Sequence, residues 1–373
     1  MRCPCRSCML GAIALAVSTT IGAGVLGLPK ALYLAGPTGV LIGVIVAFFL
    51  FLSAMMLSDM LQREKKPVQL PALLSRILGE KWKYFVYMTL IFSMYGALSA
   101  YLIGFGSQLN ALTGTPDLYS GIALFVLCGY LVYRGTKAIE RIDLPLAAAL
   151  VVFLVLLSGV NLTNFSGFAF TTPTTASLLT FTGTMLFALF GLNVIPEINF
   201  LSKGKTAKVY AISTLLCLVL YLGFAFTTVG VLGPETTDLG TRGLALHYGG
   251  IYNPLISLFT ITALFTSFLG IGLGMRHIYE FDFKLPRLMS TLAVMLPPLA
   301  VFSWSGTLGF GFLDILGLAG ELTLPLFTIT VSYAYLRALP KLKPKTPYPE
   351  TAAVLAGLFY AFVFVFSVVE LIL

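Results

Sequence analysis

The chain has 373 residues, of which 58% are hydrophobic and only 10% are charged. A water-soluble globule of this length needs far more polar surface, so the composition excludes a soluble protein and predicts an integral membrane protein. The formal net charge of +8 does not indicate nucleic-acid binding, because the Lys and Arg residues form short clusters between apolar runs without an aromatic–basic surface motif.

Apolar runs bounded by charged residues predict eleven membrane-spanning helices. A spanning helix needs about 20 apolar residues, whereas a membrane barrel needs alternating strands of about 10, and the sequence lacks that alternation. The expected fold class is therefore all-α. The predicted spans are 9–34, 37–61, 83–112, 120–134, 143–162, 178–200, 209–232, 254–275, 288–304, 308–337 and 351–372.

Residues 1–8 are predicted to be a cytoplasmic tail that contains Cys3, Cys5 and Cys8. A C-x-C-x-x-C motif can bind a soft metal, but the sequence has only two histidines and no second ligand pair. We therefore expect a reduced, disordered tail. A signal peptide is the alternative interpretation, but no small-residue cleavage site follows this start.

The first span is interrupted at 18–29, STTIGAGVLGLP, by three glycines and a proline. Both residue types disfavour a continuous helix, so we expect the helix to break partway across the membrane. Non-helical backbone survives at that depth only inside protein or beside a wet cavity. The stretch also matches G-x-G-x-x-G, but a dinucleotide fold needs an acidic residue about 20 positions on, where this sequence is apolar.

The connections between the spans indicate the orientation. Of the 23 Lys and Arg residues, 21 lie in the N-terminal tail and in every second connection, leaving only Lys30 and Arg242 elsewhere. Because cytoplasmic loops carry the excess of positive charge, we predict a cytoplasmic N-terminus and, after eleven crossings, an external C-terminus. The longest outer connection, 233–253, is either a lid over an entrance or a plain surface loop.

The sixth span repeats the interruption of the first. Gly191 and Pro196 are separated by the same five positions as Gly24 and Pro29. Interrupted spans at corresponding places of two halves point to the binding site of an inverted-repeat transporter. The predicted units are a first repeat of spans 1–5 over 9–162, an inverted second repeat of spans 6–10 over 178–337, and an additional span, 351–372.

Each interruption frees backbone groups that can bind a small charged solute. Free amides at a half-helix N-terminus suit a carboxylate, and free carbonyls at the opposing end suit a cation or an ammonium group. A zwitterionic amino acid offers both groups. The alternative is a Gly-Pro kink that only shapes helix packing.

Five glycine-rich runs, in this order and spacing, resemble the hydroxy and aromatic amino acid permease branch of the amino acid/auxin permeases. That branch belongs to the amino acid, polyamine and organocation superfamily, whose members have the LeuT fold. The likeness covers nearly the whole chain, and the order of the motifs carries it more than any one motif. The runs are Ser18 to Pro29, Tyr95 to Ser107, Phe187 to Pro196, Thr266 to Gly274 and Leu316 to Gly320.

The resemblance implies a substrate site between spans 1 and 6, flanked by spans 3 and 8. The backbone amides of Ala23, Gly24 and Val25 would meet the substrate carboxylate. The side chains that would line the remaining walls are Phe187, Phe190 and Asn193 from span 6 and Tyr95 and Ser99 from span 3. Aromatic side chains in an apolar helix are, in the alternative interpretation, ordinary core residues.

The resemblance also implies a candidate Na⁺ site. The hydroxyls of Thr266 and Ser267 would complete an oxygen cage with the carbonyls of Ser18 and Ile21, a ligand set that suits a hard cation. The alternative is that these hydroxyls bond to their own helix. Proton-coupled relatives place a lysine in the fifth span, and this fifth span has none.

Two acidic residues lie at membrane depth. Glu197 follows Pro196, and Glu321 lies midway along the tenth span. Because an unpaired charge is costly in the membrane, both are candidates for proton coupling or gating. The alternatives are an ion pair of Glu197 with a cytoplasmic lysine and a buried hydrogen bond of Glu321.

These observations predict a multi-pass transporter of the cell membrane that imports a neutral, aromatic or large hydrophobic amino acid together with Na⁺ or H⁺. Its partners would be the amino acid, the cation and the lipid bilayer, with no cofactor other than a bound Na⁺ and no nucleic acid. The alternatives are a transporter of another small amine or zwitterion, and a sensor or channel with the same fold. An enzyme is not expected, because no intramembrane His accompanies the scattered carboxylates.

Overall fold

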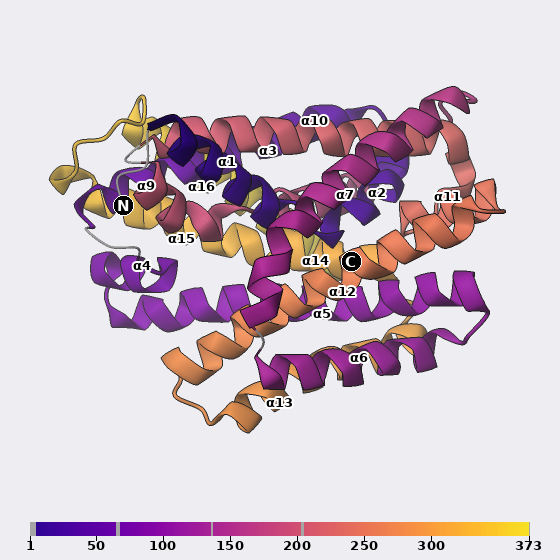
Figure 1. The fold of residues 1–373 in the computed structure, drawn as a ribbon. Coiled ribbons are helices and arrows are strands. Elements are labelled where there is room, and N and C mark those ends of the chain that lie inside the picture. Colours follow the sequence, from indigo (N-terminus) through magenta and orange to yellow (C-terminus); the bar gives the residue numbers. More distant parts are fainter. Residues whose placement is uncertain (1–4, 65–67, 136, 203–204, 373) are drawn as a thin grey trace.

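A computed structural model describes the protein over residues 5–64, 68–135, 137–202 and 205–372, and all regular structure in these ranges is helical (Figure 1). The first half contains α1 (Cys5–Thr20), η1 (Ala23–Gly27), α2 (Leu28–Ala35), α3 (Thr38–Met60), η2 (Leu61–Arg63), α4 (Leu70–Leu78), α5 (Glu80–Thr113), α6 (Asp117–Arg134) and α7 (Lys137–Thr163). α1 begins at Cys5, inside the segment predicted as a tail, and the side chains of residues 1–8, with the cysteine motif, lie outside the described part.

The second half has the same helical character. It contains α8 (Thr175–Ala188), η3 (Leu192–Val194), α9 (Ile195–Leu201), α10 (Thr206–Leu232), η4 (Gly233–Glu235), α11 (Gly240–Tyr248), α12 (Tyr252–His277), η5 (Ile278–Asp282), α13 (Arg287–Leu308), α14 (Phe312–Leu318), η6 (Ala319–Thr323), α15 (Leu324–Ala338), η7 (Leu339–Lys341) and α16 (Pro349–Ile372). Long apolar runs form these helices, and α5, α6 and α13 end where a glycine adopts a left-handed conformation, at Gly114, Gly135 and Gly309.

Among the described residues, nine helices are long and apolar enough to cross a membrane, and the bent pair Met9–Thr20 and Ala23–Ala35 makes a tenth crossing. The apolar part of α7, Ala148–Thr163, is too short to count by the same criterion. The all-helical membrane fold is therefore confirmed, whereas an eleventh crossing stays a prediction.

The helices form two groups that enclose the interrupted crossings. In Figure 1, α3 and α10 run side by side along one edge of the bundle, and α5 runs along the other side beside α6 and α12. α8 packs against α3, and the 3₁₀ turn η1 of the first interruption packs against α12, so the interrupted segments lie in contact with both groups. Large apolar side chains such as Leu41, Phe92 and Leu216 remain on the outer surface, as expected for a bundle surrounded by lipid.

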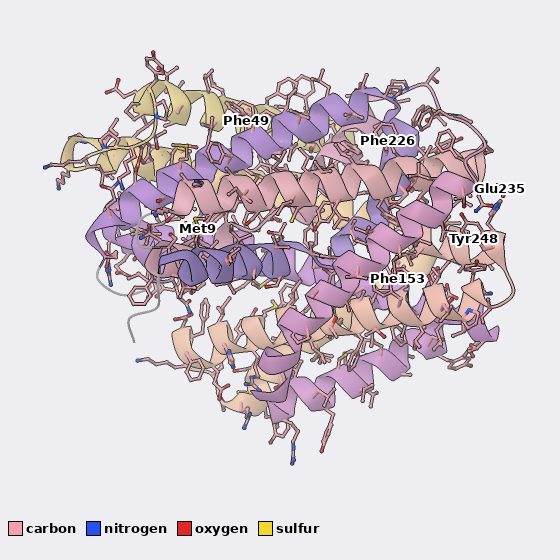
Figure 2. The ribbon with its side chains drawn as sticks, turned by 45° about the horizontal axis from the view of Figure 1, so that its top comes forward. Met9, Phe49, Phe153, Phe226, Glu235 and Tyr248 are labelled. Carbon is pink, nitrogen blue, oxygen red and sulfur yellow. The ribbon has the colours of Figure 1, made fainter. Side chains whose placement is uncertain are left out.

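The connection between α10 and α12 folds back over the first interrupted crossing. Its helix α11 packs on α2, α5 and α12, and a methyl group on Gly240 would lie 2.5 Å from Pro29 Cγ. Figure 2 shows Glu235 and Tyr248 together at one end of the bundle, opposite Met9 at the start of α1. The connection is therefore packed against the core of the helix bundle.

Both interrupted crossings have the same local design. In each, an α-helix ends, a few non-helical residues follow, a short 3₁₀ turn forms, and a second α-helix begins with proline in its first turn. Proline fits there because the first amides of a helix have no partner within it. The first crossing bends by 50° at its break, and it is the one pair in the described ranges bent by more than 40°.

Candidate functional site

The two interruptions contact each other, and a glycine makes each contact possible. A methyl group on Gly24 would lie 3.1 Å from Phe187 Cδ1 and 3.3 Å from Ala188 Cα. Reciprocally, a methyl group on Gly191 would lie 2.5 Å from Thr20 Oγ1. In each break, the absence of a side chain at the glycine therefore allows the other crossing to pack closely against it.

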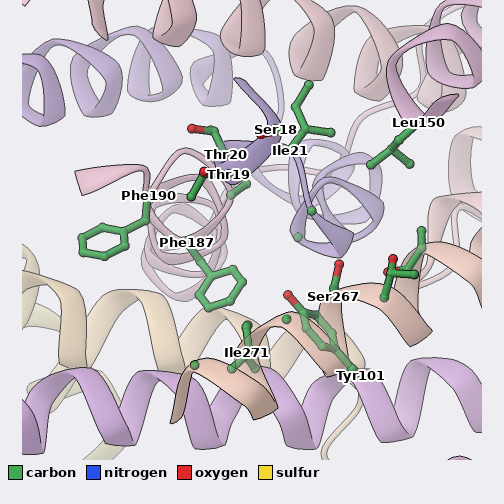
Figure 3. A pocket seen from close by; sticks show the side chains of 18 of the residues that line it. Ser18, Thr19, Thr20, Ile21, Tyr101, Leu150, Phe187, Phe190, Ser267 and Ile271 are labelled. Carbon is green, nitrogen blue, oxygen red and sulfur yellow. The ribbon is translucent and has the colours of Figure 1, made fainter. Parts of the chain in front are cut away.

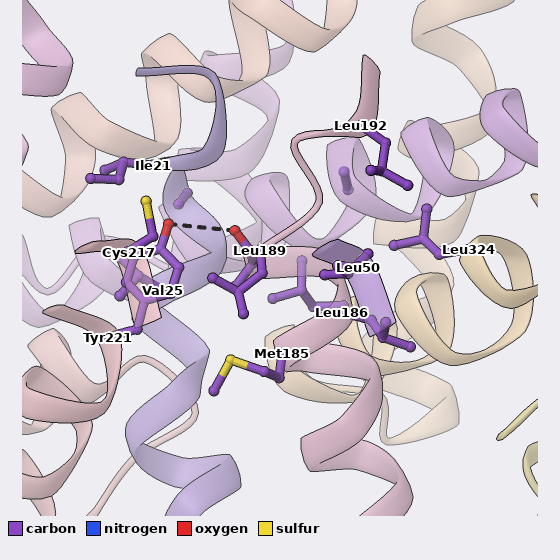
Figure 4. Packing of buried hydrophobic residues seen from close by; sticks show 14 of the residues in the cluster. Ile21, Val25, Leu50, Met185, Leu186, Leu189, Leu192, Cys217, Tyr221 and Leu324 are labelled. Atoms are coloured by element: carbon purple, nitrogen blue, oxygen red, sulfur yellow. Dashed lines mark hydrogen bonds between the residues drawn. The ribbon is translucent and has the colours of Figure 1, made fainter. Parts of the chain in front are cut away.

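One buried hydroxyl joins the two breaks. Tyr221 of α10 donates a hydrogen bond to the carbonyl of Thr20, where α1 ends, at 2.9 Å, and its oxygen lies 3.4 Å from the carbonyl of Ala188, where α8 ends (Figure 4). The Tyr221 side chain is fully buried. Both carbonyls belong to the last turn of a helix, where no intrahelical donor is available. Tyr221 thus holds the ends of both broken helices in register, although nothing in the apolar pattern of its span singles it out.

We expect Tyr221→Phe to lower the stability of the protein by about 1–3 kcal/mol and to weaken substrate binding, because buried carbonyls are left without a donor. Thermal unfolding and binding measurements on the purified protein check both effects. Tyr360→Phe is the matched control, since the Tyr360 hydroxyl is equally buried but bonds to Ser53, away from the breaks. An unchanged affinity in Tyr221→Phe would contradict a role for this hydroxyl at the site.

A cavity of about 710 Å³ lies against the two breaks. Its wall is formed by α1 and the first break, the end of α8 with the second break, α5, α7 and α12, and it is mainly apolar. Figure 3 shows the end of α1 with Ile21 of the first break facing Phe187 at the end of α8, with Tyr101 and Ser267 nearby. The volume falls in the range of small-molecule binding sites.

The cavity brings together eight of the candidate residues. They are Gly24, Phe187, Phe190, Asn193, Ser18, Ile21, Thr266 and Ser267. Ala23 and Val25 are buried next to it and do not line it, although Ala23 donates its amide to Ser267 Oγ at 3.1 Å. Phe190 is half-buried and packs edge-on against Phe327 of α15.

The other two candidates from α5 lie on the wrong face to line the cavity. The Tyr95 hydroxyl donates to the carbonyl of Ala293 at 2.6 Å and lies 2.8 Å from the Tyr279 hydroxyl, and Ser99 donates to the Tyr95 carbonyl. The α5 residues that do line the cavity recur at helical spacing and are Leu90, Ser93, Met94, Ala97 and Tyr101. Tyr101 is therefore the polar aromatic group that this helix contributes, and the sequence motif did not single it out.

The hydroxyls of the candidate cation site have protein partners. Thr266 donates to the carbonyls of Thr262 and Ala263 in its own helix, and Ser18 donates to that of Leu15. Hydroxyl oxygens that donate still keep lone pairs for a cation. In the described part of the chain, no group of three His, Cys, Asp or Glu side chains could hold a metal ion.

The two candidate carboxylates lie in different surroundings. Glu197 of α9 is exposed and does not line the cavity. Glu321 of η6 is buried, with 7% of its surface exposed, and it also lies outside the cavity lining. Leu324, one turn after Glu321, does line the cavity.

Charged side chains gather around the connection that carries α11. Burial, and next the negative charge of Asp314, raise the pKa of Asp238, whereas Lys30 and Arg242 oppose this shift. Asp314 accepts the amide of Gly311 at 2.8 Å at the start of α14. The approach of Asp238 to α14 requires glycine at position 311, because a methyl group there would overlap the Asp238 carboxylate.

The arrangement of the helices is similar to that of a solved structure. The crystal structure of MhsT in complex with L-phenylalanine matches with a TM-score of 0.70 and 16% sequence identity, and the match covers 96% of this chain and 98% of that chain. The fold is therefore that of the LeuT-type membrane transporters.

Sequence comparison defines the family. The model of the tryptophan/tyrosine permease family matches residues 6–373, and the chain belongs to this family of permeases, which are not enzymes. The tyrosine-specific transport system 1 of Haemophilus influenzae is 26% identical over 343 residues, which cover 84% of both chains. The tryptophan-specific transport protein of Shigella flexneri is 26% identical over 345 residues, covering 84% of this chain and 82% of the relative.

Proposed function

We propose that this permease is a secondary active transporter that imports a neutral aromatic amino acid, tryptophan or tyrosine, together with a cation. The observation that carries the proposal is the contact between two interrupted crossings beside a largely apolar cavity. The similarity to a tyrosine-specific and to a tryptophan-specific transport protein supports the aromatic substrate.

The substrate would bind with its carboxylate against the backbone amide of Gly24. The first amides of a helical segment are free to bind an anion, and Gly24 lies in the first turn after the break and lines the cavity. The aromatic side chain would pack against Phe187 and Tyr101. Asn193 is exposed to the cavity and would bond to the polar edge of an indole or phenol ring.

The cation gradient would drive uptake by a population shift. Substrate and cation each bind one access state better than the other, so together they favour the occluded state. Sodium would bind between the carbonyls of Ser18 and Ile21 and the hydroxyls of Thr266 and Ser267, whereas a proton needs a carboxylate. The protein would lie in the cell membrane with a cytoplasmic N-terminus, as the distribution of Lys and Arg indicates.

Uptake into proteoliposomes tests the proposal. We expect purified protein to accumulate labelled tryptophan or tyrosine when a Na⁺ or pH gradient is imposed, with excess unlabelled aromatic amino acid competing and glutamine competing poorly. Liposomes without protein and liposomes without either gradient are the controls. Uptake that is independent of both gradients would contradict cation coupling.

The same preparation separates the alternatives. Ion currents without amino acid would indicate a channel, and binding without exchange across the membrane would indicate a sensor. If an amine without a carboxylate competed better than the amino acid, the proposed binding of the carboxylate by the Gly24 amide would be wrong.

A further inference from the structure

A buried acid lies outside the cavity and has no partner for one of its oxygens. Glu321 is part of the π-helical turn η6, which interrupts the tenth predicted span between α14 and α15. Its Oε2 atom is buried without a hydrogen-bond partner, and no salt bridge reaches it in the ranges that the structure describes. An ionised carboxylate in this position would cost several kcal/mol, so the site accommodates the neutral acid.

The groups around Glu321 do not supply a counter-charge. The hydroxyl of Ser367 of α16 lies within reach of the Glu321 carboxyl, and in this conformation neither this hydroxyl nor Glu321 Oε2 has a well-formed hydrogen bond. Glu370, one turn further along α16, is acidic and exposed. The turn also packs against α5, α8, α14 and α15. α8 has no titratable residue. The nearby acids and tyrosines of α14, α5 and α15 form hydrogen bonds away from Glu321. These pairs are Asp314 with Gly311, Tyr95 with Tyr279 and Tyr335 with Asp59.

The turn that carries Glu321 is in direct backbone contact with a helix of the substrate site. A methyl group on Gly183 of α8 would lie 2.9 Å from Glu321 Cβ, and one on Gly320 would overlap the Gly183 carbonyl. Five residues after Gly183, α8 ends at Ala188, beside Gly24 of the first break. Because backbones in contact cannot slide without repacking, a change of charge at Glu321 is transmitted to α8 and to the cavity. π-turns within helices often occur at functional sites.

We propose that Glu321 is the binding site of the coupling proton, and that the proton acts on the substrate site through the contact of Gly320 with Gly183. The buried neutral acid belongs to the conformation that substrate favours, whereas in the other access state Glu321 is an ionised carboxylate. The carboxylate therefore takes up one proton when substrate binds, and the neutral acid releases that proton when substrate leaves. Ser367 accepts the hydrogen bond of the neutral acid. This inference rests on the proposed transport function and adds the identity of the cation and its site.

Reciprocal coupling between substrate and proton gives the direction in which pH changes the substrate affinity. If substrate and proton favour the same state, the affinity for tryptophan must rise as the pH falls, by about tenfold for a coupling of about 1.4 kcal/mol. Glu321→Gln replaces the acid with a neutral amide of the same shape. We therefore expect its Kd for tryptophan to be independent of pH between 5 and 8 and close to the value of the unmodified protein at low pH.

Transport by the same variant provides the second readout. Glu321→Gln should exchange tryptophan across the membrane without a gradient but should not accumulate it when a pH gradient is imposed. Glu370→Gln is the matched control, because it removes an exposed acid from the same neighbourhood and should keep both pH dependence and accumulation. Accumulation by Glu321→Gln driven by the pH gradient would overturn the inference.

The outcomes also separate this inference from the transport function itself. Absence of exchange in the unmodified protein would overturn the proposed function, whereas exchange together with a pH-dependent Kd in Glu321→Gln would overturn only the proton site. A measurement on the unmodified protein covers the case in which the variant does not fold. Addition of tryptophan in weak buffer near neutral pH should consume protons, and no proton uptake would contradict the proposal.

Discussion

Gly191→Ala is expected to weaken tryptophan binding about tenfold and to reduce uptake accordingly. The added methyl group would lie 2.5 Å from Thr20 Oγ1, whose hydroxyl is held by a hydrogen bond to the Ala16 carbonyl. Overpacking of this kind costs about 1–3 kcal/mol, and 1.4 kcal/mol corresponds to a factor of ten in affinity. The cost falls on the contact between the two breaks, where we place the substrate.

A second substitution tests whether that contact is the cause. Thr20→Ala removes the Oγ1 atom, after which the nearest atoms to the new methyl group are Tyr210 Cε2 at 3.6 Å and the residue 20 Cβ at 3.8 Å, both ordinary contacts. The double variant Gly191→Ala/Thr20→Ala should therefore recover most of the affinity, with Thr20→Ala alone as control. Titration calorimetry on the unmodified protein, the two single variants and the double variant measures the coupling between the two positions. Additive effects would show that the breaks do not meet as described.

Gly320→Ala is expected to have the largest effect on stability. The new methyl group would overlap the Gly183 carbonyl and would lie 2.6 Å from its carbon and 3.0 Å from its Cα. All three atoms are backbone atoms and cannot rotate away, so α8 and the turn of Glu321 would be forced apart. We expect a loss of about 3 kcal/mol or more, the upper end of overpacking costs, seen as a lower yield of monodisperse protein and a lower melting temperature.

The chain offers a matched control for this substitution. Gly223 of α10 and Gly306 of α13 are also helical glycines, and a methyl group added to either one would have no atom within 4 Å. Alanine at these positions should leave the melting temperature unchanged or raise it slightly, because alanine is the better helix former. If Gly320→Ala were as stable as Gly223→Ala, α8 and the turn would not be in contact.

The backbone events at the site could be predicted from the sequence, because glycine and proline act locally. Gly24 and Pro29, repeated as Gly191 and Pro196, indicated both breaks, and both are present. The contact between the two breaks could be predicted from the same residues, because non-helical backbone at membrane depth must be buried in protein or face a wet cavity. The order of motifs likewise indicated the fold that the structural comparison confirms.

The side chains of α5 show what the sequence could not supply. Tyr95 and Ser99 were chosen from a motif, whereas Met94, Ala97 and Tyr101 line the cavity. In a soluble protein, polar residues would mark the outer face of such a helix. Here lipid and protein core are both apolar, so the periodicity carries little information about which face is inward. Tyr221 was missed for a related reason, since its role depends on carbonyls of two distant segments.

The central claim is that the two breaks together bind the amino acid, and a structure determined with bound tryptophan tests it most directly. We predict that the tryptophan carboxylate lies within hydrogen-bond distance of the Gly24 amide, about 2.7–3.2 Å, and that the indole packs against Phe187. Tryptophan bound away from both breaks, for example between Phe153 of α7 and Phe259 of α12, would contradict the account.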